Sequence, residues 1–359
     1  MSTVPTLDFS HFLTGTFEQR SIFCSHLVAG FKKYGFVKLI KHGIPESVVK
    51  NLFEYERRFF SLPRTLKETT RMELKPGPQR GWIPYGIEKT SGLAKILEER
   101  PDYAFERVGD TSDLKDERES FDIGPAHDTL YPNSWPAAIS EKRTEPLPGF
   151  QPFMETYFAL CQGICLQIIM AVEIGLKVPA GTLLHRCAND ASELRFNYYP
   201  STTVQSIASG RAKRSWPHTD FGVLTLLFQD SVGGLELEDR TEPGTFMPIT
   251  AAGPGQPSEL IVNTAECLTR WTNDVLRAGL HQVVIPRHLR ESGGETVIPD
   301  RYSCPFFLKA GYNVSVGPVK EFVSSEEQAL YGDISALDYH RERVRVVYEG
   351  AIEGGSGRE

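Results

Sequence analysis

A series of eight short apolar runs between residues 194 and 316 limits the folds open to this chain of 359 residues. Each run spans only a few residues, and Gly, Pro or Asp separates it from the next. Short apolar segments divided by turn residues are typical of β-sandwiches and barrels. The pattern therefore predicts a double-sheet jelly roll with a rigid, dry interior that is reached from one open end. The eight runs cover 194-199, 223-228, 234-238, 245-249, 259-262, 280-285, 301-308 and 312-316.

Helical periodicity is found on both sides of this region. Apolar residues recur at three- and four-residue steps over 17-34, 46-60 and 150-178, which predicts helices with one buried face. The same spacing predicts a helix from Ser324 to Tyr348. Residues 101-150 lack a clear period and are predicted to be mostly loop.

The expected fold is mainly β with flanking helices. A double-stranded β-helix (jelly roll, cupin-like) forms the core, and an α-helical N-terminal portion and a C-terminal helix join it. No linker rich in Pro, Gly and Ser divides the chain, so we expect one catalytic domain. The expected portions are 1-150, helical or mixed with substrate loops, then 151-320, the catalytic core, and 321-359, the C-terminal helix and a tail frayed over 351-359.

One histidine and one aspartate stand two residues apart just before the run at 223-228. Residues two apart on a strand point to the same face, so His218 and Asp220 are expected to project side by side. They supply two of the three ligands of a 2-His-1-carboxylate site for non-haem Fe(II). For the third ligand we favour His281, because an apolar, β-branched run follows it. His288 is the alternative, although its neighbours predict an exposed turn.

Arg301 and Ser303 are also two residues apart on a predicted strand. A guanidinium group can hold a carboxylate with two hydrogen bonds, and a hydroxyl on the same face can add a third. Upstream, the segment Asn197-Tyr198-Tyr199-Pro200 adds a phenol that could reach the same pocket. A metal site with a carboxylate anchor beside it is therefore the central prediction.

These motifs resemble those of the Fe(II)/2-oxoglutarate-dependent dioxygenases related to isopenicillin N synthase, which share the His-x-Asp pair, the distant His, the Arg-x-Ser pair and the Asn-Tyr-Tyr-Pro segment. The resemblance covers most of the chain, from Pro5 to about Phe307. Residues 226-235 and 270-274 are most similar to a fungal branch that includes thymine hydroxylase and a tropolone ring-expansion dioxygenase.

The resemblance implies a cofactor, two cosubstrates and a reaction. Fe(II) would be bound, 2-oxoglutarate and O2 would be consumed, and ascorbate is allowed as a reductant. The implied reaction oxidises a C–H bond and releases succinate and CO2. The site residues implied are the metal ligands His218, Asp220 and His281, and the cosubstrate-binding residues Arg301, Ser303, Tyr199 and Asn197.

The substrate pocket is less constrained by the sequence. By strand parity Phe307 faces the same side as Arg301, and Phe221 directly follows the expected metal-binding aspartate, so the two rings are candidates to sandwich a flat substrate. Arg195 is typical of the fungal branch and is a candidate to pair with a carbonyl or an acidic phenol. Plain core packing or an ion pair is the alternative for each. The expected substrate is a small aromatic or polyketide-type product of secondary metabolism, changed by hydroxylation or ring expansion.

Two further features have a functional and a structural interpretation. The segment 80-85 is expected either to cross the mouth of the active site or to pack through Trp82 and Tyr85. His42 lies far from the His-x-Asp pair and is expected to be a structural hydrogen-bonding residue.

The amino-acid composition limits the kinds of partner that this protein is expected to bind. The formal net charge of −7 argues against nucleic acid or an anionic membrane as a partner. No apolar run approaches the ~18 residues of a transmembrane helix, and the first residues lack the pattern of a signal peptide. The six cysteines show no metal-binding spacing and are expected to be buried thiols in a reducing compartment. We expect a cytoplasmic monomer or weak homodimer that binds a small-molecule substrate.

Three alternatives stay open at this stage. An isopenicillin N synthase-type Fe(II) oxidase would use no 2-oxoglutarate and would bind its substrate with Arg301 and Ser303, so succinate formation distinguishes it. A zinc hydrolase would leave that pair unexplained. A non-catalytic binding module would normally have lost a metal ligand.

The departures from the family are a long interval between His281 and Arg301, with 290-295 as the apparent insertion, and Gln282 where arginine is common.

Overall fold

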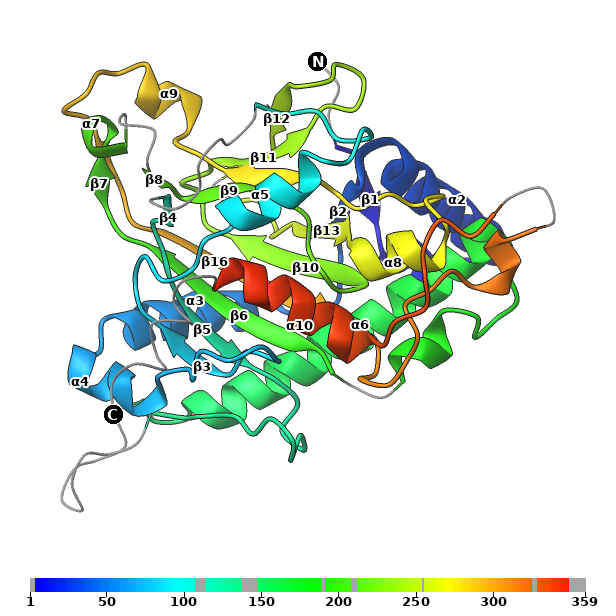
Figure 1. Cartoon of the computed structure of the whole chain (residues 1–359), viewed down its shortest axis with the longest axis horizontal. Coiled ribbons are helices and arrows are strands. Elements are labelled where there is room, and N and C mark those ends of the chain that lie inside the picture. The colour runs from blue at the N-terminus through cyan, green and yellow to red at the C-terminus, as the bar shows by residue number, and fades with distance from the viewer. Residues whose placement is uncertain are drawn as a thin grey trace.

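The computed structural model describes residues 4–106, 114–136, 147–188, 191–207, 212–253, 255–324 and 328–348. Two β-sheets of eight and four strands lie at the centre, and helices cover the outside (Figure 1). Two short ladders lie beside them: β15 (Val297–Ile298) pairs with β7 (Thr202–Thr203), and β4 (Lys115–Asp116) pairs with β8 (Ala212–Lys213).

The larger sheet is antiparallel except at one edge, where β1 and β2 run parallel. Strands from the N-terminal portion and from the predicted core both take part in it, so the two portions share one sheet. Its order is β1 (Thr6–Asp8), β2 (Phe36–Ile40), β13 (Leu260–Thr264), β10 (Leu224–Gln229), β16 (Arg301–Leu308), β6 (Glu193–Tyr199), β5 (Glu119–Ile123) and β3 (Gly81–Ile83).

The smaller sheet is antiparallel throughout. Its inner side chains share a small apolar cluster with residues of the larger sheet, among them Leu235 and Val283 against Tyr199 and Ile261. The two sheets therefore enclose a common interior. The order of the smaller sheet is β12 (Phe246–Pro248), β11 (Leu235–Glu238), β14 (His281–Val283) and β9 (Ser215–His218).

Strand β10 shows how residue alternation produces a core on one side and a cavity on the other. Leu224, Leu226 and Phe228 pack in the main apolar core together with helical residues. Thr225 and Leu227 point the other way and line the central cavity. Since successive residues of a strand face opposite sides, one strand serves both the core and the site.

The helices are α1 (Ser10–Leu13), α2 (Phe17–Tyr34), α3 (Glu46–Phe60), α4 (Arg64–Lys67), α5 (Ser91–Leu97), α6 (Phe150–Leu176), α7 (Val204–Ile207), α8 (Glu266–Trp271), α9 (Arg287–Arg290) and α10 (Ala336–Val347), with 3-10 turns at Glu68–Thr70, Leu184–Cys187 and Lys320–Phe322. Helices α2, α3 and α6 pack against the larger sheet, and the longest, α6, runs across it behind the strands in Figure 1. Helix α5 instead contacts β9 of the smaller sheet.

Local sequence signals fix the ends of α2. The Thr16 side chain accepts from the Gln19 backbone while the Gln19 side chain accepts from the Thr16 backbone, which is a capping box. Gly35 ends the helix with φ of 71°, and a Cβ there would lie 2.8 Å from the backbone of Gly279. The predicted helices at 17-34 and 46-60 are confirmed at both ends.

Helix α6 is long and apolar enough to cross a membrane by length and composition, and no other helix of the described residues is. One face of α6 is buried in the main core, where Tyr157, Ile168 and Val172 lie. The prediction of a core scaffold helix is therefore confirmed. The six cysteines are buried thiols outside any disulfide, as predicted.

Two predictions need correction. The stretch 101-150 is mostly irregular where the structure describes it, but it also contains strands β4 and β5. Their signal is hidden because β5 carries charged residues that pair inside the protein, such as Asp122 with Arg195. The segment 312-316 is not a strand. Val316 instead donates its backbone N–H to Ile334, and this contact ties two irregular segments together.

The predicted C-terminal helix begins twelve residues later than expected. Residues 328–335 are not helical, and α10 begins after Ser335, whose side chain accepts from the backbone of Asp338. The predicted frayed end at 351-359 and the parts of the predicted loop at 107-113 and 137-146 lie outside the described residues.

Candidate active site

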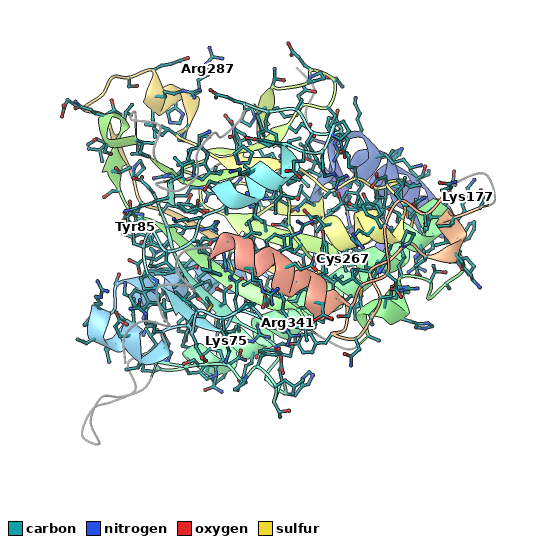
Figure 2. The ribbon with its side chains drawn as sticks, viewed as in Figure 1. Lys75, Tyr85, Lys177, Cys267, Arg287 and Arg341 are labelled. Atoms are coloured by element: carbon teal, nitrogen blue, oxygen red, sulfur yellow. The ribbon has the colours of Figure 1, made fainter. Side chains whose placement is uncertain are left out.

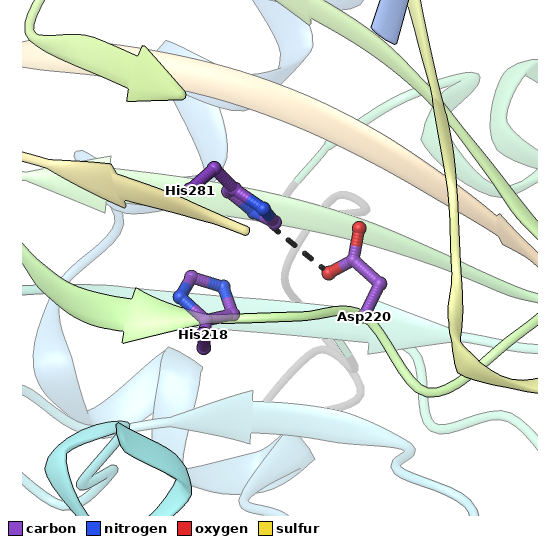
Figure 3. A group of neighbouring side chains, drawn as sticks. All are labelled: His218, Asp220 and His281. Atoms are coloured by element: carbon purple, nitrogen blue, oxygen red, sulfur yellow. Dashed lines mark ion pairs between the residues drawn. The ribbon is translucent and has the colours of Figure 1, made fainter. Parts of the chain in front are cut away.

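The three expected metal ligands come together where β9 and β14 pair (Figure 3). His218 ends β9, and His281 begins β14 directly opposite it, with ring centroids 4.3 Å apart. Asp220 lies 4.0 Å from His281, measured from Oδ1 to Nε2. One ligand atom from each of the three residues lies within 4.8 Å of the others. The expectation that His218 and Asp220 share a strand is wrong, because Asp220 lies in the loop after β9.

Hydrogen bonds orient each of these side chains toward a common point. Nδ1 of His218 lies 2.7 Å from the Trp216 carbonyl, and Nδ1 of His281 lies 2.9 Å from the Gly279 carbonyl. A carbonyl only accepts, so both Nδ1 atoms carry the proton and both Nε2 lone pairs are free for a metal.

The carboxylate of Asp220 is held in the same manner. Its Oδ2 accepts from Thr225 Oγ1 at 2.6 Å and from Asn263 Nδ2 at 2.8 Å, which leaves Oδ1 toward the histidines. Burial and the neighbouring His281 lower the pKa of His218 to about 3, so its imidazole is neutral. Two neutral imidazoles and one carboxylate on one side are the donor set of non-haem Fe(II) sites. The residues present therefore fit a ferrous ion.

Arg301 and Ser303 lie on β16 with their side chains on the cavity side. Arg301 is 1% exposed, and its Nε donates to the Gly233 carbonyl at 2.9 Å. Nη1 donates to Ser303 Oγ at 3.2 Å, and Nη2 donates to Gln229 Oε1 at 3.0 Å. Each Nη atom keeps a second N–H without an acceptor among the described residues. The fork is therefore rigid and still able to bind a carboxylate.

Strand β6 places two further expected residues beside this pair. In the β6–β16 register Tyr199 stands opposite Arg301, and Asn197 stands opposite Ser303. The Arg301 guanidinium carbon lies 4.9 Å from the centre of the Tyr199 ring. Asn197 Oδ1 is buried without a hydrogen-bond partner among the described residues. Both side chains line the same cavity as Arg301.

One cavity connects the triad with the arginine anchor. Its empty volume is about 960 Å³ including the open mouth. Phe221 and Phe307 both line it, and Phe307 faces the same side as Arg301, as strand parity predicts. Leu93 of α5 and Val347 of α10 close the wall away from the strands.

Arg195 lines the cavity, but its guanidinium is occupied by protein groups. Nε and Nη2 donate to Asp122 at 2.7 and 3.0 Å, and Nη1 lies 2.9 Å from Glu88 Oε1. The structure therefore does not present Arg195 as a free cation for a carbonyl or phenol. Through these pairs it holds Asp122 and Glu88 in place beside the cavity.

The segment 80-85 does not cross the mouth of the cavity. Trp82 is 2% exposed and donates to Glu119 at 2.8 Å, and neither Trp82 nor Tyr85 lines the cavity. Tyr85 lies at the left edge of the molecule in Figure 2. The packing alternative is confirmed for Trp82 and is wrong for Tyr85, which is 47% exposed. His42 is a structural residue as predicted, with Nε2 3.2 Å from the Ser258 carbonyl.

The sequence interpretation missed the charged wall of the cavity. Glu88 lies 2.9 Å from Arg118 Nε and accepts from the Tyr348 hydroxyl at 2.7 Å. Burial alone would raise the pKa of Glu88, but Arg118 and Arg195 outweigh it and lower the pKa to about 2. The residues that pair with Glu88 come from segments far apart in the sequence. No local sequence pattern therefore predicts this charged wall. Thr225 and Asn263, in contrast, stand out as polar residues inside apolar runs.

Gly222 controls the position of the Asp220 loop. A Cβ at Gly222 would lie 2.4 Å from the Leu308 carbonyl oxygen, which is fixed because it accepts from Val223 at 2.7 Å. In Gly222→Ala the loop must move instead, and we expect Fe(II) affinity to fall by roughly tenfold or more. Anaerobic Fe(II) titration measures this. Gly253→Ala is the matched control, since a Cβ there meets no atom within 4 Å, and equal affinities of the two variants would contradict the prediction.

A core of two β-sheets holding a 2-His-1-carboxylate triad beside a buried arginine anchor defines a class of non-haem iron oxygenases, and comparisons with known proteins agree. Residues 191–310 match the 2OG-Fe(II) oxygenase superfamily, and residues 4–138 match the family described as non-haem dioxygenase in morphine synthesis N-terminal. The chain is 39% identical over 361 residues to the 2-oxoglutarate-dependent dioxygenase imqE of Aspergillus flavus, covering 97% of this chain and 95% of that protein.

Two further relatives extend the comparison. The 2-oxoglutarate-dependent dioxygenase ecdK of Aspergillus rugulosus is 42% identical over 346 residues, which cover 96% of this chain and 100% of ecdK. The crystal structure of a full-length Neurospora crassa protein in complex with alpha-KG and thymine is similar with a TM-score of 0.77 and 27% identity, covering 96% of this chain and 97% of that one. The chain therefore belongs to the 2OG-Fe(II) oxygenase superfamily. It is an oxidoreductase that uses Fe(II), 2-oxoglutarate and O2.

Proposed function

We propose that this dioxygenase oxidises a C–H bond of a small, flat, uncharged molecule in fungal-type secondary metabolism. The observation that carries the proposal is the single cavity that joins the His218-Asp220-His281 triad to Arg301 and to the two rings of Phe221 and Phe307. The names of the relatives support the reaction class, and the substrate class follows from the cavity wall.

The proposed division of roles follows the hydrogen bonds. His218 and His281 would hold Fe(II) through Nε2, and Asp220 through Oδ1, because their other polar atoms are already occupied. Fe(II) with 2-oxoglutarate and O2 supplies the oxidising equivalent that removes a hydrogen from a C–H bond and releases succinate and CO2.

Arg301 and Ser303 would bind the distal carboxylate of the cosubstrate, with Tyr199 packed against the guanidinium and the Asn197 amide free to accept a hydrogen bond. The apolar side chains around the triad exclude water, which keeps the oxidant directed at the bound substrate.

The charges of the cavity wall support an uncharged substrate. Each of two wall carboxylates has basic partners: Glu88 pairs with Arg118 and Arg195, and Glu193 pairs with Arg80 and Lys309. A charged substrate would therefore meet no unpaired counter-charge at this wall. Flat rings with hydrogen-bonding edges suit the space between Phe221 and Phe307, and the Neurospora crassa relative has structures with thymine and with 5-formyluracil.

The test combines binding and turnover. The full chain is loaded with Fe(II) and 2-oxoglutarate under nitrogen, mixed with matched neutral and carboxylated aromatic compounds, and exposed to O2. We expect succinate in proportion to an oxidised product from neutral compounds, and weaker binding in Phe221→Ala. Products formed only from the carboxylated compounds would refute the substrate class. Oxidation without succinate would instead favour an isopenicillin N synthase-type oxidase.

The two-sheet core is proposed to be a double-stranded β-helix. Two facing antiparallel sheets with the site between them, and the similarity to 2OG oxygenase structures, support this assignment. A cytoplasmic location and a monomer or weak homodimer stay predictions from the sequence.

A further inference from the structure

A second arginine lies near the cosubstrate anchor and has no ion-pair partner among the described residues. Arg214, directly before β9, is 1% exposed, and its Nε and Nη1 have no hydrogen-bond partner among the described residues. Its one hydrogen bond within that part of the chain runs from Nη2 to the Pro299 carbonyl at 2.8 Å. No carboxylate of the described residues forms an ion pair with it. A buried unpaired charge costs stability unless something compensates it, so its presence needs an explanation.

Arg214 and Arg301 share one aromatic neighbour. The Arg214 guanidinium carbon lies 5.8 Å from the centre of the Tyr199 ring, and that of Arg301 lies 4.9 Å from it. Burial, together with repulsion between the two cations, lowers the pKa of Arg214 to about 10, which still leaves it charged at neutral pH. Two positive charges therefore lie beside the Tyr199 ring: Arg301, which lines the cavity, and Arg214, which does not.

The acidic groups near Arg214 form their hydrogen bonds with other residues. Asp230 accepts the backbone N–H groups of Tyr302 at 2.6 Å and of Val232 at 3.0 Å. Glu117 forms its side-chain hydrogen bond with Tyr85. Both attract Arg214 from a distance. Among the described residues, no carboxylate therefore contacts the Arg214 guanidinium.

We propose that Arg214 determines specificity for a dicarboxylate cosubstrate, because the distal carboxylate of 2-oxoglutarate bound at Arg301 would add a negative charge near this buried guanidinium, which has no ion-pair partner among the described residues. The inference rests on the proposed place of 2-oxoglutarate at Arg301 and Ser303. Arg214 acts through the electric field and the packing of Tyr199, so it is a positioning residue. In a buried site such charge interactions are weakly screened, and loss of one is expected to weaken binding by about tenfold.

The test compares two cosubstrate probes that differ only at the distal end. The full chain with Fe(II) under nitrogen is titrated calorimetrically with 2-oxoglutarate and with 2-oxopentanoate, which has the same five-carbon chain and chelating end but no distal carboxylate. In Arg214→Met we expect affinity for 2-oxoglutarate to fall by about tenfold and affinity for 2-oxopentanoate to stay within about twofold. Arg214→Lys should retain part of the preference. Lys213→Met removes a neighbouring charge and should leave both affinities unchanged.

The stability of the free protein gives an independent readout. Because the Arg214 side chain forms no ion pair among the described residues, the metal-free Arg214→Met variant should melt no lower than the wild type. If Arg214→Met binds both probes equally more weakly and also melts at a lower temperature, the role of Arg214 is purely structural and the inference is overturned. If the wild type itself does not prefer 2-oxoglutarate to 2-oxopentanoate, the proposed anchor at Arg301 fails. If the preference exists and Arg214→Met retains it, the inference alone fails.

Discussion

Replacing His281 with alanine is expected to lower 2-oxoglutarate-dependent oxidation by roughly a thousandfold or more and to abolish tight Fe(II) binding. The reason is geometric. His281 is the only one of the three ligands contributed by β14, and its Nδ1–H is fixed by the Gly279 carbonyl so that Nε2 points to Asp220. With it removed, the two remaining ligands leave the metal with more open positions than the facial site has. Anaerobic Fe(II) titration and succinate release measure the two effects.

His288→Ala is the matched control for this experiment. It removes the same side chain only seven positions away, from the exposed face of the short helix α9, which Figure 2 locates by Arg287 at the outer surface. We expect Fe(II) affinity and turnover to remain within about twofold of the wild type. A His288→Ala variant that loses iron, or a His281→Ala variant that keeps it, would show that the third ligand is assigned to the wrong histidine.

The geometry of the triad shows how far the sequence predicts a site. His218 and His281 were predictable because each adjoins an apolar run, and the structure places them opposite each other on paired strands. The position of Asp220 could not be predicted, because strand β9 ends at His218 and Asp220 lies in the loop that follows. Hydrogen bonds from α8 hold this loop, and one of them runs from the Glu266 N–H to the Asp220 carbonyl at 2.8 Å. Strand parity cannot reveal a loop that tertiary contacts fix.

Burial of charge sets the second limit of the sequence interpretation. Helices with a repeating apolar face, such as α2 and α3, were predicted to the residue, because the period of apolar residues is local and α2 also carries a capping box. Arg214 and Glu193 look like ordinary surface residues in the sequence, and only the fold shows that they are buried. Their partners lie up to 116 positions away, as for Lys309 and Glu193, so no local pattern predicts them.

Glu193→Gln is expected to destabilise the folded protein at pH 7 by about 3 to 5 kcal/mol. Glu193 is 1% exposed, and Oε1 accepts from Arg80 Nη1 at 2.9 Å and from the Gln79 backbone at 2.7 Å. Its Oε2 pairs with Lys309. The amide keeps the shape but removes the negative charge, which leaves the partly buried Lys309 without its ion-pair partner and the buried Arg80 with Asp128 alone. Chemical denaturation of the metal-free chain measures the change in the free energy of unfolding.

The pH dependence separates this electrostatic effect from a packing defect. Burial would raise the pKa of Glu193, but Lys309, His340 and Arg80 outweigh it and lower the pKa from 4.5 to about 2. A lowered folded-state pKa contributes stability that is present above pH 4.5 and is lost as the pH falls toward 2, here about 3 kcal/mol. The difference between wild type and Glu193→Gln should therefore shrink over that range. Glu321→Gln, at an exposed glutamate, should change little, and a difference that is independent of pH would show that packing, and not charge, explains the loss.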